Sequence, residues 1–523
     1  MRASRVDTHR QKWYTCFTER GENIQKTQIM KEKLQKTLSV INRFIQSDYF
    51  ILFAAVMILI GWCFDVWAPM LAVLTLVAIL PLFFGKGTKQ VLCVAMMFTL
   101  IIRSNRHRLD DYAWLLFLVI VLLVGALFNL IRYRRSLSLL SPKKIKGFHC
   151  SLLALAIPFA LGGAGTPTEN VLAILAALAL VLVAGTSYSF FVVTQDEKDR
   201  KGMAEYILKV LFAMGVVICA QMIVYFSSFD NFDEVINAMV MKNVALGWAG
   251  PNNVAPTLSM TIPATLYFCI KKNKATPLFA IMATLEYIFI ISTGCRGAIL
   301  FTTIAMPAMC LYVMAKSENK VLFGVTLGVL FAAIIFVGAY YGEYVSKVLT
   351  TILNKGLDSS GRVEMLYPEA IEVFKKWPIF GSGWDYHLGG MAHNNYTPYW
   401  YHSTALQILA TMGITGVIGF AFFYFFRYRT FLVARKNPAA IMLLCGTILF
   451  DAYGMIDTNF FGPTFFIMLL IMTFAVEINL PASKCRAFGG HNPFVEIPDF
   501  FKRLFAKLSV KKLPSDEYER ETD

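Results

Sequence analysis

The chain has 523 residues, of which 57% are hydrophobic and only 16% are charged, and its mean hydropathy is +0.56. This composition excludes a soluble protein with a large core and indicates an all-α, polytopic membrane protein. A net charge of +15 would suit a nucleic-acid partner, but the basic residues lie mostly in the tails and in alternate connections. That pattern is typical of membrane topology and contact with membrane lipid, so we expect no nucleic acid.

Residues 1–48 form a polar, basic segment. Apolar residues recur in it at intervals of three and four, at Met30, Leu34, Leu38, Ile41 and Ile45. This period predicts an amphipathic helix on the cytoplasmic membrane surface. The alternative is a solvated tail whose periodicity is accidental.

About fourteen apolar runs, and no fewer than about twelve, are long enough to cross a bilayer. In chain order they are 49–66, 68–84, 91–102, 112–131, 148–161, 171–193, 206–226, 254–270, 277–291, 298–313, 321–341, 405–426, 439–450 and 463–476. We therefore expect an N-terminal transmembrane bundle at 49–246, a second region at 247–430 that includes a long loop, further transmembrane helices at 431–480 and a basic cytoplasmic tail at 481–523.

Lysine and arginine gather in every second connection, for example at 132–146 and 427–436. Because such clusters favour the cytoplasm, both termini are predicted inside and a long loop, 342–402, outside. Arg103, Arg106 and Arg108 disagree with this map, since they would also lie outside.

The 342–402 loop is unusually long for a connection between spans, and long loops in compact proteins are usually functional or disordered. Its many aromatic residues, Trp384 and Tyr401 among them, argue against disorder. It also carries Arg362, His393 and His402, which can hold an anion or move a proton. We expect the loop to be partly helical.

Two arginines of the predicted outer face, Arg296 and Arg362, could bind a diphosphate through paired, charge-assisted hydrogen bonds. A nearby histidine could take a proton from an attacking hydroxyl group. No Asp-x-Asp pair and no Gly-x-x-x-x-Gly-Lys loop is present, so we expect metal-independent attack on a diphosphate-linked donor. A snorkelling contact with lipid headgroups is the alternative role of Arg296.

His402-Ser403, nine residues and then Gly413-Ile-Thr-Gly416-Val417 resemble the motif of the bacterial O-antigen ligases. The surrounding blocks also resemble the domain that these ligases share with Wzy-type O-antigen polymerases. These blocks are Gly250-Pro-Asn-Asn-Val-Ala255, Thr293-Gly-Cys-Arg-Gly297, Ser360-Gly-Arg362 and Trp377-Pro-Ile-Phe-Gly-Ser-Gly383.

The resemblance implies an enzyme of the bacterial cytoplasmic membrane that has no cofactor. Its catalytic region would be 247–430, with an extracytoplasmic active site. It would transfer an oligo- or polysaccharide from a polyprenyl diphosphate donor to a hydroxyl of a glycan, lipid or cell-wall acceptor. Ligase and polymerase both stay open. The implied catalytic residues are His402, Arg296 and Arg362, and the candidates for substrate binding are Asn253, His393, Trp384 and Tyr401.

Each motif residue also has a structural interpretation. Gly413 and Gly416 would permit close helix packing, and Asn252 and Asn253 are predicted to cap the following helix. Aromatic residues can anchor a protein at the membrane interface. A lipid-linked oligosaccharide flippase or a polysaccharide exporter is the alternative function. Either would need charged residues in several spans, whereas the ionisable groups here gather in the predicted outer loops.

Overall fold

The computed structural model describes residues 36–84, 87–103, 114–132, 146–164, 197–271, 274–354, 361–384 and 400–480, together with residues 33, 175, 177, 178, 180, 185, 192, 194, 195, 386, 387, 390 and 391. The contacts divide the chain into two compact units, Met1–Arg134 and Arg135–Asp523. The predicted boundary between residues 246 and 247 falls inside the second unit.

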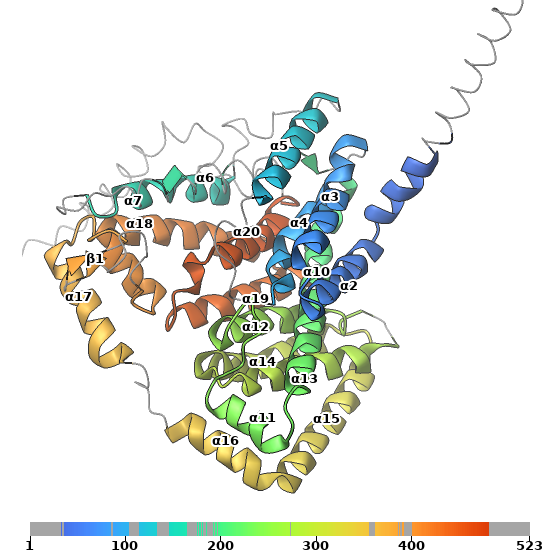
Figure 1. Ribbon diagram of the computed structural model, residues 1–523, viewed down its shortest axis with the longest axis vertical. Helices are drawn as coiled ribbons and strands as arrows, with labels where there is room; N and C mark the ends of the chain where they lie inside the picture. Colours follow the sequence, from blue (N-terminus) through green and yellow to red (C-terminus); the bar gives the residue numbers. More distant parts are fainter. Residues whose placement is uncertain are drawn as a thin grey trace, which may run out of the picture. The chain divides into compact units, whose positions relative to one another are not determined.

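The predicted all-α class is confirmed, because the described elements are helices apart from one short ladder (Figure 1). In that ladder β1 (Tyr386–His387) runs antiparallel to β2 (Gly390–Met391), with Tyr386 opposite Met391. A helix satisfies its own backbone hydrogen bonds, which a bilayer interior requires.

Among the described residues, five helices are long and apolar enough to cross a membrane: Trp67–Phe84, Asp199–Phe226, Arg296–Lys316, Lys320–Tyr340 and Thr404–Val433. The helices Lys36–Ile45 and Tyr49–Cys63, bent by 75°, would make a sixth if they form one span. Shorter apolar helices occupy several other predicted runs, and most of the run at 171–193 lies outside the described residues. The total of about fourteen spans and the sidedness of the termini stay predictions.

The first unit contains the helix Lys36–Ile45 and then α2 (Tyr49–Cys63), α3 (Trp67–Phe84), α4 (Lys89–Met97), η1 (Phe98–Ile101) and α5 (Leu115–Arg132). The predicted N-terminal amphipathic segment is helical at Lys36–Ile45, whereas Met30 and Leu34 lie outside the described residues. Ile45 is buried, while Ile41 and Phe44 are exposed. Its binding to a membrane surface stays a prediction.

The second unit is built around α12 (Pro251–Tyr267), whose residues from Val254 onward are all buried. It packs against α10 (Glu197–Phe226), α13 (Thr276–Ser292), α14 (Arg296–Lys316) and α19 (Pro438–Gly454). Hydroxyl groups on α12 bond to carbonyls of their own helix, as Thr257 does to Asn253 (2.7 Å), so they can be buried at low cost. Small residues then allow the close packing typical of membrane helices.

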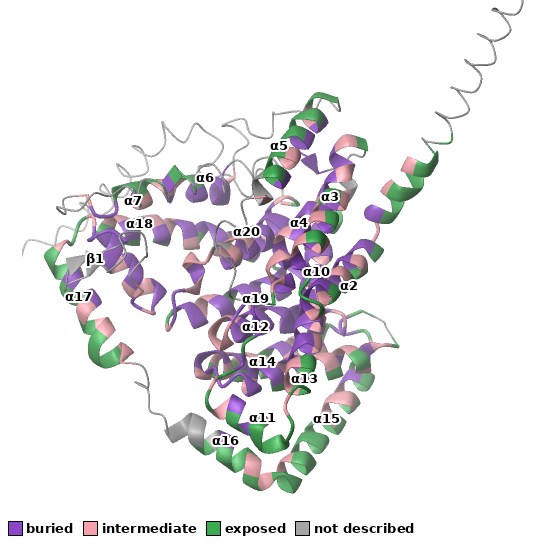
Figure 2. Cartoon of the chain, viewed as in Figure 1, coloured by how far each residue is buried: buried purple, intermediate pink, exposed green. Residues whose placement is uncertain are grey.

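The remaining helices surround this core. They are α6 (Gly147–Ala154), α7 (Ala156–Leu161), α11 (Phe232–Val240), α15 (Lys320–Tyr340), α16 (Gly342–Asn354), the π-helix η5 (Arg362–Leu366), α17 (Tyr367–Lys376), α18 (Thr404–Val433), η6 (Asn459–Phe461) and α20 (Pro463–Glu477). Figure 2 shows α12 and α19 buried and α15 exposed along its length. An apolar, exposed helix such as α15 is typical of a surface that faces lipid.

The predicted 342–402 loop is partly helical, since α16, η5 and α17 all fall within it. It joins α18 through backbone hydrogen bonds at a break in that helix. Gly413 interrupts α18 with φ 59° and ψ −150°, which leaves neighbouring N–H and C=O groups without their helical partners.

The loop segment 378–383 supplies those partners. Ile414 and Thr415 donate their N–H groups to the carbonyls of Pro378 and Ile379, at 2.8 and 3.1 Å. In return, Ser382 and Gly383 donate to the carbonyls of Ala410 and Thr411, at 2.8 and 3.1 Å. The Trp377–Gly383 block and the Gly413–Gly416 motif are therefore two halves of one backbone pairing.

Glycine is required at the centre of this pairing. A Cβ on Gly413 would lie 2.6 Å from the carbonyl oxygens of both Pro378 and Ile379. A Cβ on Gly381, at φ 69°, would lie 2.2 Å from the carbonyl carbon of Thr411. The close approach at Gly413 is thus to a loop backbone and not to a second helix, while a Cβ on Gly416 would meet Met412 and Ile408 of α18 itself.

We predict that Gly413→Ala destabilises the protein by about 1–3 kcal/mol, because alanine must adopt a strained backbone conformation against two carbonyl oxygens. The measurement is the thermal unfolding temperature of the purified protein in detergent. Gly328→Ala in α15 is the matched control, since a Cβ there meets no atom within 4 Å. Equal unfolding temperatures for the two variants would contradict the pairing.

Candidate functional site

His402 precedes Ser403, the N-cap of α18, and has a positive φ of 50°, which is uncommon for residues other than glycine. The neighbouring residues hold it on both sides. The Tyr367 hydroxyl donates to the His402 carbonyl (3.3 Å), and Ser403 caps α18 by accepting from the Leu406 N–H. The His402 side chain is 37% exposed, so a substrate can reach it.

Asp457 lies beside His402 and was not among the residues predicted from the sequence. It follows α19 in the short connection to η6, and its side chain is only 5% exposed. One carboxylate oxygen lies 3.3 Å from His402 Nδ1 and accepts from the Thr458 N–H (2.8 Å). The other accepts from the Tyr453 hydroxyl at 3.0 Å.

Arg362 approaches the same carboxylate from the first turn of η5. Its Nη2 lies 3.7 Å from Asp457 Oδ2, and its Nη1 donates to the Ile456 carbonyl at 2.6 Å. Its Nε is buried and has no hydrogen-bond partner among the described residues. A guanidinium carries five N–H donors, so this contact leaves Arg362 with donors for a further anion.

Burial would raise the pKa of Asp457, but its surroundings lower that pKa below the ordinary 3.8. The causes are the hydrogen bond with His402, the Thr458 N–H and the positive charge of Arg362. Asp457 is therefore ionised at neutral pH. An ionised carboxylate at Nδ1 favours the tautomer with its proton on that nitrogen, which leaves His402 Nε2 able to accept a proton.

Arg296 begins α14, and both of its neighbours in the chain contact the segment that carries Asp457. Cys295 Sγ lies 3.5 Å from the Tyr453 hydroxyl. A Cβ on Gly297 would come within 1.9 Å of the Ile456 side chain. The structure therefore brings Arg362, His402 and the backbone that carries Arg296 to one segment, residues 453–457, although they are far apart in sequence.

The predicted capping by Asn252 and Asn253 is wrong. The N-cap of α12 is Gly250, with Pro251 in the first turn and no side-chain capping bond. Proline is common in the first turn of a helix because the N–H group that it lacks would have no helical partner there. The Asn252 carbonyl instead accepts from the Asn459 side chain at 2.7 Å, which ties α12 to the connection after Asp457. The Asn253 N–H donates to the Gly250 carbonyl at 3.0 Å.

Two aromatic candidates for sugar binding are buried in this conformation. Trp384 is 5% exposed and packs against Phe159 and Phe461, with ring centroids 5.3 and 5.0 Å away. Tyr401 is 0% exposed and lies in a cluster with Ala370, Val373 and Ala410. Stacking on a sugar would require their rings to move, and that role stays a prediction. His393 lies outside the described residues.

Residues 278–421 match the family model described as O-antigen ligase. The match contains Arg296, Arg362 and His402, and it confirms the predicted resemblance to the O-antigen ligase and Wzy-type superfamily. Asp457 lies beyond the matched residues. No curated protein matches the chain.

We predict that Asp457→Asn lowers the unfolding temperature at neutral pH and has a diminishing effect in acid. A carboxyl group whose pKa is depressed by folding stabilises the folded state above its ordinary pKa, and this stabilisation is lost as the pH falls through the folded-state value. The difference in unfolding temperature between the wild type and the variant should therefore disappear as the pH falls below 3.8.

The measurement is the unfolding temperature across this range, with Asp233→Asn on the exposed first turn of α11 as the control. A gap that stays constant as the pH falls would contradict the ionised state of Asp457.

Proposed function

We propose that this membrane protein transfers an oligo- or polysaccharide from a polyprenyl diphosphate carrier to an acceptor hydroxyl, on the ground that residues 278–421 match the O-antigen ligase family model. The observation that carries the proposal is the contact of Asp457 with both His402 and Arg362. It puts a proton acceptor and an anion-binding group side by side, and the reaction needs both.

His402 acts as the general base in this proposal. Its Nε2 takes the proton of the acceptor hydroxyl while the hydroxyl oxygen bonds to the anomeric carbon of the donor sugar. The bond from that carbon to the diphosphate oxygen breaks, and the diphosphate leaves with the electron pair. Asp457 holds the imidazole in position and stabilises its positive charge.

Arg296 and Arg362 bind the diphosphate and neutralise the charge that develops on it as it leaves. Arg362 is preorganised for this, since the Ile456 carbonyl and Asp457 hold its guanidinium. Arginine suits the task because its planar group can donate two parallel hydrogen bonds to phosphate oxygens. No metal is invoked to carry this charge.

We assign the site to the outer face of a bacterial cytoplasmic membrane. Asp457 follows the C-terminus of α19, a helix about 25 Å long. Arg435 and Lys436 lie just before its other end, and Arg429 of α18 lines the same cavity as they do. Clusters of basic residues favour the cytoplasmic side, which supports an extracytoplasmic position for Asp457 and His402. The acceptor is a glycan, a lipid or a cell-wall polymer.

We predict that His402→Ala lowers the transfer rate by about a hundred- to ten-thousand-fold, the usual contribution of a general base. Asp457→Asn should also slow transfer, because it removes the group that orients the imidazole. The double variant should be no slower than His402→Ala alone, since residues that act as one unit are not additive.

The measurement is the single-turnover rate with purified donor and acceptor, for variants that elute like the wild type and are assayed below their own unfolding temperatures. A near-normal rate for His402→Ala, or fully additive losses in the double variant, would contradict these roles.

We further predict that replacing Arg296 and Arg362 together by lysine slows transfer, since lysine keeps the charge but loses the paired donors. Each lost contact should cost on the order of 3 kcal/mol in the barrier, with a smaller effect on the KM for the acceptor. The reaction should persist in chelator. A fully active double lysine variant, or complete loss in chelator that magnesium restores, would show that these arginines are not the diphosphate site.

A further inference from the structure

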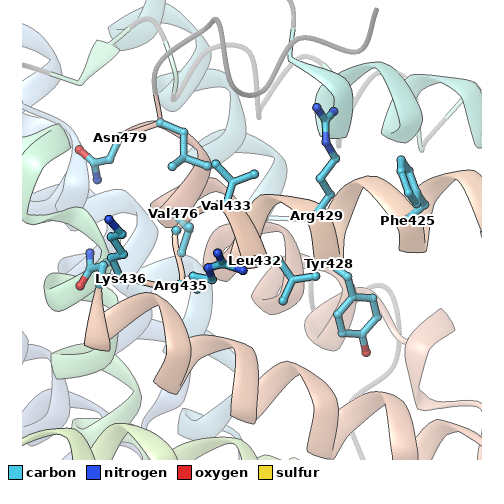
Figure 3. A pocket seen from close by; sticks show the side chains of 13 residues that line it. Phe425, Tyr428, Arg429, Leu432, Val433, Arg435, Lys436, Val476 and Asn479 are labelled. Atoms are coloured by element: carbon cyan, nitrogen blue, oxygen red, sulfur yellow. The ribbon is translucent and has the colours of Figure 1, made fainter. Parts of the chain in front are cut away.

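A cavity of about 840 Å³ lies at the opposite end of α19 from Asp457 (Figure 3). It is bounded by the C-terminal turns of α18, the start of α19 and the end of α20, with Ala204 of α10 also on its wall. None of its lining residues belongs to the candidate site around His402.

Three basic residues, Arg429, Arg435 and Lys436, line this cavity, and none of its described lining residues is acidic. Arg435 and Lys436 are exposed, while Arg429 is half-buried. The acid nearest to the cavity along α20, Glu477, is 1% exposed and does not line it. The wall therefore carries a net positive charge that suits an anion.

The helix dipoles do not add to this positive charge. Asn437 also lines the cavity and caps α19, because its side-chain oxygen accepts from the Ala439 N–H at 3.0 Å. The positive N-terminus of α19 therefore points to the cavity. The negative C-termini of α18 and α20, which also bound the cavity, oppose it with about half a charge each, so the net positive charge comes from the three cations.

The rest of the wall is apolar and leads along α18. Phe425 is 61% exposed and Leu432 is 55% exposed. They are seven residues apart and thus lie on one face of the helix. Because α18 is long and apolar enough to cross a membrane, this face would meet acyl chains. A free anion would use the cations but would leave the apolar face unused.

We propose that this cavity binds one anionic phospholipid of the membrane. The headgroup phosphate lies among Arg429, Arg435 and Lys436, and an acyl chain lies against Phe425 and Leu432. Basic pockets between the ends of transmembrane helices favour anionic headgroups for the same electrostatic reason. The bound lipid would join the ends of α18, α19 and α20 and thereby hold α19 at the end remote from Asp457.

The test is to titrate the delipidated full-length protein in uncharged detergent with palmitoyl-oleoyl phosphatidylglycerol and to count bound lipids by native mass spectrometry. The matched titrant is palmitoyl-oleoyl phosphatidylcholine. The variant is Arg429→Gln/Arg435→Gln/Lys436→Gln. Its control is Lys274→Gln/Lys316→Gln/Lys320→Gln, which removes the same charge from exposed positions outside the cavity.

We expect one tightly retained phosphatidylglycerol in the wild type and in the control, and binding about a hundredfold weaker in the cavity variant. Phosphatidylcholine should bind with the same affinity to the wild type, the cavity variant and the control. Phe425→Gln/Leu432→Gln should weaken phosphatidylglycerol binding with all three cations in place, and excess inorganic phosphate should not displace the lipid. Should the triple variant not fold, the exposed single variants Arg435→Gln and Lys436→Gln should each give an intermediate loss.

Equal phosphatidylglycerol affinity in the cavity variant and the control would overturn the proposal. Complete displacement by inorganic phosphate would indicate a free-anion site instead. Lipid binding that appears only after removal of the acidic residues 514–523 would show that the end of the chain occupies the cavity. The experiment measures lipid binding and not glycan transfer. A negative result would therefore overturn the lipid site without affecting the proposed function.

Discussion

The backbone pairing between residues 378–383 and 410–415 is the interaction on which the rest of the candidate site depends. A helix broken within an apolar environment must find new partners for its freed N–H and C=O groups. The Trp377–Gly383 block supplies them at Gly413, with hydrogen bonds of 2.8 to 3.1 Å. That pairing ties α17, and with it Arg362 at the start of the preceding η5, to α18, which begins two residues after His402.

Asp457, in the connection after α19, joins His402 and Arg362. Its carboxylate is buried, yet it has several partners, since it contacts His402, Arg362, Tyr453 and the Thr458 N–H. A buried charge of this kind is tolerated only when it is paired and hydrogen-bonded. The same contacts that stabilise the carboxylate fix the imidazole and the guanidinium, so here the cost of burial is offset by interactions that also organise the site.

The sequence predicted the helices and part of the site, because both depend on local patterns. Apolar runs located α2, α3, α14, α15 and α18, and the His402 and Gly413 spacing indicated the family. Asp457 was missed because it stands alone between two spans, with no motif around it. Its position beside Arg362 depends on tertiary packing, in which α19 lies against α12 and α14. Asn252 was misjudged because Pro251 moves the helix start to Gly250.

The most direct test of the central claim is an electron cryomicroscopy map of the protein with bound polyprenyl diphosphate-linked donor. We expect diphosphate density within hydrogen-bond distance of the guanidinium groups of Arg296 and Arg362, with the first sugar directed toward His402. Diphosphate density elsewhere, for example among Arg429, Arg435 and Lys436 with none at Arg362, would contradict it.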